Sequence, residues 1–108
     1  MKRVRYLDEA RVEFLHELAY YAAVSRPLAR RFDEMVQQAE DLAREFPAAG
    51  SPSFGGARKM RVRAFPFSLV YAEAGNEIIV LAMAHHSRRP GYWHSRIGKD
   101  RSSRQTHG

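Results

Sequence analysis

A short segment near the C-terminus gathers most of the side chains that could do chemistry. Directly after the apolar run 78–84 come two imidazoles, two guanidiniums and a phenol: His85, His86, Arg88, Arg89 and Tyr92. Imidazole and phenol transfer protons, and arginine stabilises an anionic transition state. Cleavage of an RNA phosphodiester requires proton transfer and stabilisation of an anionic transition state, and these groups can supply both. His86 and Tyr92 are therefore candidate proton-transfer residues, and Arg88 is a candidate transition-state stabiliser.

The histidines do not predict a metal site. His85 and His86 are adjacent, and adjacent side chains of a strand point to opposite faces of a sheet. No carboxylate follows them at ligand spacing, and the chain has no cysteine that would bind zinc. We expect neither a metal nor a cofactor. The sequence leaves open which of the two histidines faces the working surface.

A second group of basic residues alternates with apolar residues in the segment 58–64. Lys59, Arg61 and Arg63 share one face at strand spacing. A row of such groups suits a phosphate backbone, which it contacts by charge and by paired hydrogen bonds. The alternative is a solvated strand whose charges discourage aggregation at a sheet edge. Together with Arg89, these residues form the candidate nucleic-acid-binding set.

The charge of the whole chain is uneven. The net charge is +6, yet residues 8–45 carry nine acidic residues against five arginines. Residues 46–108 carry ten basic residues against three acidic ones. This asymmetry favours a polyanionic partner, either nucleic acid or an acidic protein. The alternative is that the basic residues only keep a small domain soluble.

Hydrophobic periodicity predicts the elements that position these residues. The expected elements are a strand over 3–7, helices over about 9–23 and 26–46, and strands over 59–64, 67–73 and 78–84. Pro27 separates the two helices because proline is tolerated only in a first helical turn. Glu13 and Glu17 form an i, i+4 pair on the predicted solvent face of the first helix.

The order β-α-α-β-β-β predicts an α+β fold with two layers. A helix hairpin returns the chain to the end of the sheet that it left, so we expect the first strand to pair antiparallel with the last. This gives a four-stranded antiparallel sheet with the helix hairpin packed on one face. No helix covers the other face, where Tyr92 and above all Trp93 are expected to form an aromatic cap.

The length of 108 residues allows one domain with one hydrophobic core. We expect this domain to span residues 1–97, followed by a polar, disordered tail over 98–108. The longest apolar run, 78–84, is too short to span a bilayer, and the basic N-terminus is not followed by the apolar region of a signal peptide. The expectation is a cytoplasmic protein with no membrane partner.

Five segments together point to a known family. They are Phe46-Pro47-Ala48-Ala49-Gly50, Arg61-Val62-Arg63, Phe67-Ser68-Leu69-Val70-Tyr71, Ile79 to His85, and Arg88-Arg89-Pro90-Gly91-Tyr92-Trp93. With them, residues 3–97 resemble toxins of the RelE/ParE superfamily from bacterial type II toxin–antitoxin systems. The resemblance implies the same β-α-α-β-β-β order. It also implies a growth-inhibiting toxin that a cognate antitoxin neutralises in a hetero-oligomeric complex.

The superfamily implies two mechanisms. RelE-like members cleave messenger RNA on the ribosome with basic and tyrosine residues around the sheet, and His86, Tyr92, Arg61 and Arg63 fall near those positions. ParE-like members poison DNA gyrase by protein contact, without nuclease chemistry. We slightly favour a metal-independent, ribosome-dependent RNA endonuclease and keep the gyrase poison as the alternative. A member that only binds its antitoxin is the third hypothesis.

Overall fold

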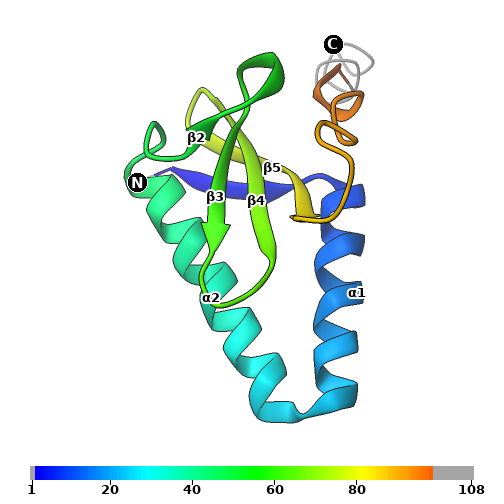
Figure 1. Cartoon of the computed structure of the whole chain (residues 1–108). Helices are drawn as coiled ribbons and strands as arrows, with labels where there is room; N and C mark the ends of the chain where they lie inside the picture. The colour runs from blue at the N-terminus through cyan, green and yellow to red at the C-terminus, as the bar shows by residue number, and fades with distance from the viewer. Residues whose placement is uncertain (1, 99–108) are drawn as a thin grey trace.

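The computed structural model describes residues 2–98 and has the predicted α+β order (Figure 1). The elements are β1 (Arg3–Tyr6), α1 (Asp8–Val24), α2 (Arg26–Glu45), β2 (Ser51–Pro52), the 3-10 turn η1 (Phe54–Gly56), β3 (Arg58–Val62), β4 (Phe67–Ala74) and β5 (Glu77–His85). The predicted tail, apart from Gly98, lies outside the described residues.

Ser25 divides the helical hairpin. Its backbone is extended, and its Oγ accepts a 3.1 Å hydrogen bond from the backbone N–H of Leu28, which caps α2. Pro27 lies in the first turn of α2, where a backbone N–H has no helical partner to lose. Within residues 2–98, neither helix is long and apolar enough to cross a bilayer.

The two helices differ in how they pack. The side chains that α2 buries recur at helical spacing: Ala29, Phe32, Val36, Ala39 and Ala43. In α1 only Ala10 is fully buried. Large apolar side chains of α1 remain exposed at Val12, Leu15, Tyr20 and Val24. The hairpin therefore leaves several large apolar side chains of α1 at the surface of the described chain.

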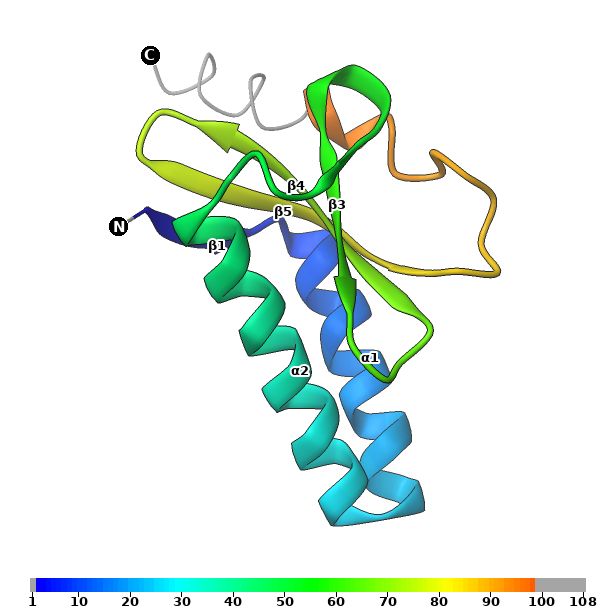
Figure 2. The ribbon, with the colours of Figure 1, turned by 60° about the vertical axis from the view of Figure 1, so that its left-hand side comes forward.

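The sheet has five strands in the order β1-β5-β4-β3-β2, with both helices on one of its faces (Figure 2). β5 lies between β1 and β4, and its apolar side chains on both faces suit this internal position. Two details differ from the prediction. A two-residue strand, β2, adds a fifth member, and β1 pairs parallel with β5 rather than antiparallel, in the register Arg3↔Glu77 to Tyr6↔Val80. The sheet is therefore mixed.

The splay of the helices explains the direction of β1. α1 and α2 diverge from their common turn as the arms of a V (Figure 1). α1 starts at the C-terminal end of β1, whereas the end of α2 returns near the N-terminal end, where Ala43 packs with Ile78 and Val4. The chain therefore re-enters the sheet at the end where β1 began, and this makes β3 and β5 run in the direction of β1.

A bulge interrupts β5 shortly before the segment that carries the candidate site residues. The pairing with β4 shifts between Val70↔Ala82 and Tyr71↔Val80, which leaves Leu81 as the extra residue. The pairing with β1 ends at Val80, whose carbonyl accepts the N–H of Leu7 at 3.0 Å. Residues 81–85 of β5 therefore continue with no strand on that side in the described part of the chain.

The C-terminal segment covers part of the sheet face opposite the helices (Figure 2). Trp93 is only 2% exposed and belongs to the main core cluster, together with Val70 and Ala82. Phe54 from η1 packs against the indole, with 6.3 Å between ring centroids. The predicted aromatic cap is confirmed for Trp93, whereas Tyr92 is placed differently.

Candidate functional site

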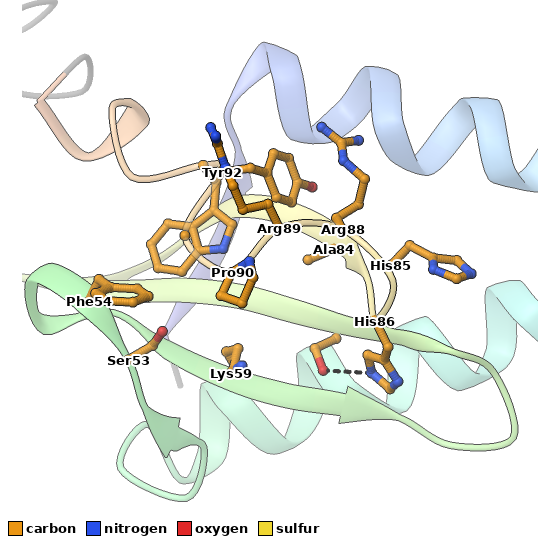
Figure 3. Close-up of a pocket in the computed structure, with 13 residues that line it drawn as sticks. Ser53, Phe54, Lys59, Ala84, His85, His86, Arg88, Arg89, Pro90 and Tyr92 are labelled. Atoms are coloured by element: carbon orange, nitrogen blue, oxygen red, sulfur yellow. Dashed lines mark hydrogen bonds between the residues drawn. The ribbon is translucent and has the colours of Figure 1, made fainter.

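The uncovered part of this outer sheet face and the segment after β5 enclose a pocket of about 230 Å³ (Figure 3). Lys59 of β3, Ser68 of β4 and Ala84 of β5 line it on the sheet side, and residues 88–93 form the opposite wall. Five of the predicted site residues line this pocket: Lys59, His86, Arg88, Arg89 and Tyr92. The pocket is therefore the candidate site.

The two histidines point to opposite faces, and His86 is the one on the outer face. Its Nε2 lies 3.1 Å from the hydroxyl of Ser68. The ring of His85 instead packs edge-on against Phe67 of the main core, at 4.9 Å. Its Nδ1 accepts the N–H of Ser87 at 3.0 Å. Within residues 2–98 there is no group of three side chains placed to hold a metal ion.

Tyr92 lines the pocket with its ring but directs its hydroxyl toward α1. The hydroxyl donates a 2.9 Å hydrogen bond to Oε2 of Glu13. The guanidinium of Arg88 stacks on the phenol ring, 3.9 Å from its centroid. Burial, reinforced by the hydrogen bond and the charge of Glu13, raises the pKa of Tyr92 to about 12. The phenol is therefore protonated at neutral pH, and its proton is held by Glu13.

The predicted catalytic trio is thus only partly assembled. In Figure 3 Tyr92 lies beside Arg88, whereas the ring of His86 lies apart from both and bonds to Ser68. A proton-transfer residue must come within hydrogen-bond reach of the proton that it moves. Arg88 and Tyr92 contact each other, whereas His86 contacts Ser68 instead.

The prediction that Glu13 faces solvent was wrong. Its carboxylate accepts four hydrogen bonds: from Met83 N–H at 3.1 Å, from the Tyr92 hydroxyl at 2.9 Å, and from Nη1 and Nη2 of Arg96 at 3.0 Å each. Arg96 also donates to the carbonyl of Leu81 at 3.0 Å. Helical periodicity could not reveal this, because every partner lies at least 70 positions away.

The basic row on the sheet is confirmed for Lys59 and Arg61, which alternate with partly or fully buried residues along β3. Arg61 is in register with Ser68 and so lies in the same row as the His86 contact. Arg63 lies just beyond β3, in the turn before β4, and is exposed. In the described chain, no acidic residue forms an ion pair with these three residues or with Arg89. Their charge remains available to a partner.

The chain is similar to one known protein family and to a solved structure. Residues 4–90 match the model of a family described as "ParE toxin of type II toxin-antitoxin system, parDE". A solved structure titled "Chromosomal ParDE TA system from P. aeruginosa" shares the fold, with a TM-score of 0.66 and 17% sequence identity, over 79% of this chain and 96% of that chain. No curated protein sequence matches the chain significantly. The family match includes Glu13 and His86 and ends before Tyr92.

Proposed function

Because the chain belongs to the ParE toxin family of type II toxin–antitoxin systems, we propose that it inhibits growth by binding DNA gyrase, without nuclease chemistry. The observation that carries this proposal is the hydrogen bond between Tyr92 and Glu13. A phenol that is held by a carboxylate and has a pKa of about 12 is a poor proton acceptor at neutral pH. Tyr92 is thus better suited to holding the segment after β5 in place than to proton transfer, which favours binding over cleavage.

The proposed contact surface is the outer sheet face. Its cations are Lys59, Arg61, Arg63 and Arg89, all exposed and without an acidic partner in the described chain. Guanidinium groups bind carboxylates and phosphates in paired hydrogen bonds. A complex of gyrase with DNA offers both kinds of anion. This surface therefore fits a target that is protein, nucleic acid or a junction of the two.

We further propose that the partner that neutralises the toxin is a cognate ParD antitoxin, in a hetero-oligomeric complex in the cytoplasm. Two features support a covering segment. The sheet carries uncompensated positive charge, which acidic residues would neutralise, and α1 exposes large apolar side chains, among them Val12, Leu15 and Tyr20. Exposed apolar side chains that gather on one helix are typical of a protein contact.

Metal-independent RNA cleavage remains a second candidate because of one feature. His86 contacts Ser68 in the pocket, next to the basic row of Lys59 and Arg61. An imidazole beside cations can move a proton on a bound phosphodiester. If His86 does so, His86→Ala lowers cleavage by about 10²–10⁴-fold. If the chain binds gyrase, the same substitution leaves growth arrest within a few-fold of the wild type.

The proposed function is tested with purified toxin and the host gyrase. We expect supercoiling of relaxed plasmid to be inhibited, and added antitoxin to relieve the inhibition. Arg61→Glu should weaken inhibition because it reverses a charge on the contact surface, whereas Arg30→Glu on the exposed part of α2 serves as the matched control. Full gyrase activity at toxin concentrations that arrest growth would refute the proposal.

A further inference from the structure

The bulged end of β5 has an open edge that side chains close. Beyond Val80, the N–H of Met83 and the carbonyl of Leu81 face the side on which β1 has already ended. Glu13 accepts from Met83, and Arg96 donates to Leu81. Buried backbone groups need hydrogen-bond partners, and open strand edges invite unwanted pairing. An ion pair between α1 and the C-terminal segment thus takes the place of a neighbouring strand.

The ion pair between Arg96 and Glu13 is largely buried and has a favourable geometry. The side chains of Arg96 and Glu13 are only 14% and 18% exposed. Nη1 of Arg96 donates to Oε1 of Glu13 and Nη2 donates to Oε2, each at 3.0 Å, the paired geometry that makes such contacts strong. Removing one member leaves the other charge partly buried and without its partner. The contact is therefore sensitive to loss of either charge.

The Glu13 carboxylate fixes the wall of the candidate site. It binds Tyr92 and Arg96, which stand on either side of Trp93 in the chain. Arg88 is in turn stacked on Tyr92. One carboxylate on α1 thus anchors the segment 88–96 at two points and sets the direction of its arginines.

We propose that Glu13 is a positioning residue for the proposed contact surface. This inference rests on the proposed function. Glu13 itself does not touch the target. It holds the segment 88–96 so that Arg88 and Arg89 meet an anionic target together with the basic row of β3. Without the anchor the segment leaves this shape for part of the time. The apparent affinity then falls in proportion to the fraction of molecules that are competent to bind.

Glu13→Gln tests the proposal because it keeps the shape of the side chain and removes its charge. Glu17→Gln is the matched control, one helical turn further along α1, where the carboxylate has only a 3.9 Å contact with the exposed His16 among the ion pairs. Trp93 is the only tryptophan of the chain and is buried beside the anchor. Quenching of its fluorescence by acrylamide therefore reports directly whether the segment stays docked.

We expect three results for Glu13→Gln. Trp93 becomes accessible to acrylamide, growth arrest and gyrase inhibition both fall at least about tenfold, and cooperative unfolding is retained. Glu17→Gln should match the wild type in all three measurements. Trp93 that stays protected in Glu13→Gln, or toxicity that persists after Trp93 is released, would overturn the proposal.

Arg96→Lys is the second variant, which decides the matter if Glu13→Gln does not fold. It keeps the positive charge and loses the paired geometry, so toxicity and Trp93 protection should lie between the wild type and full loss. Unchanged toxicity with a released Trp93 would again count against the anchor. If the wild type arrests growth without inhibiting gyrase, gyrase is not its target and the proposed function fails. Loss of growth arrest in the variants would still support the positioning role of Glu13.

Discussion

The hydroxyl of Tyr92 donates a 2.9 Å hydrogen bond to Glu13, a carboxylate 79 positions earlier in the chain. This contact separates Tyr92 from His86, although both line the same pocket. His86 instead meets Ser68 on the outer sheet face. The residues that suggested catalysis by their types are therefore divided between an anchor of the C-terminal segment and a basic surface.

The role of Tyr92 is tested by Tyr92→Phe, which keeps the ring beneath Arg88 and removes only the hydroxyl. If the hydroxyl moved a proton, toxicity would drop by about 10²–10⁴-fold. We expect growth arrest to stay within a few-fold of the wild type, because Arg96 still anchors the segment. Urea unfolding should show a loss of about 1 kcal/mol for the missing hydrogen bond.

The role of the exposed cations is tested by Arg61→Ala, in the basic row of β3, and by Arg63→Ala, in the turn that follows β3. If the target surface is anionic, each substitution should weaken binding. Where the contact is to a nucleic-acid phosphate, the slope of log affinity against log salt should also fall by about 1 per contact. Binding is measured with immobilised gyrase–DNA complex over a range of salt concentrations. Arg30→Ala and Arg31→Ala, on the exposed face of α2, are the controls and should change neither quantity.

The stability of the fold should depend on alkaline pH through Tyr92. Its pKa is raised by burial and by Glu13 from 10.0 to about 12 in the folded chain. Stability that depends on the neutral phenol is therefore complete below about pH 10 and is lost as the pH rises toward 12. Urea unfolding at about pH 9 and about pH 11 measures this loss. Tyr92→Phe should show a smaller loss, which isolates Tyr92 from Tyr6 and Tyr71, whose pKa values are also raised.

The loop before β3 depends on a glycine at position 50. The backbone N–H of Gly50 donates to the hydroxyl of Tyr71 at 3.0 Å, and a Cβ there would lie 2.5 Å from that hydroxyl and 2.9 Å from the carbonyl of Lys59. Gly50→Ala should destabilise the fold by about 1–3 kcal/mol in urea. Gly98→Ala, where a Cβ meets nothing within 4 Å, is the control. Equal stability of both variants would contradict this account.

Local patterns of the sequence predicted most of the elements because they depend on neighbouring residues. The alternation of Lys59 and Arg61 with apolar residues placed β3 and its basic face correctly. The uncovered sheet face likewise predicted the burial of Trp93. Ser51–Pro52 was missed as a strand because two residues show no periodicity.

Features that depend on distant contacts were not predictable in the same way. The direction of β1 follows from the splay of the two helices. The sequence of either helix alone does not determine this splay. Glu13 lies on the face of α1 that looks polar in isolation, and its partners Tyr92 and Arg96 belong to the other end of the chain. Glu13 on α1 and Arg96 after the aromatic pair form an ion pair at the edge of β5 that the bulge leaves open. Neither residue suggests this contact in the sequence.

Two measurements on one culture distinguish action on gyrase from cleavage of RNA. After induction of the toxin, plasmid supercoiling and the 5′ ends of cellular messenger RNA are determined at the same time points. We expect altered supercoiling with unchanged messenger RNA ends, and we expect co-expressed antitoxin to restore normal supercoiling. New messenger RNA ends that appear while supercoiling stays normal would contradict the proposed function.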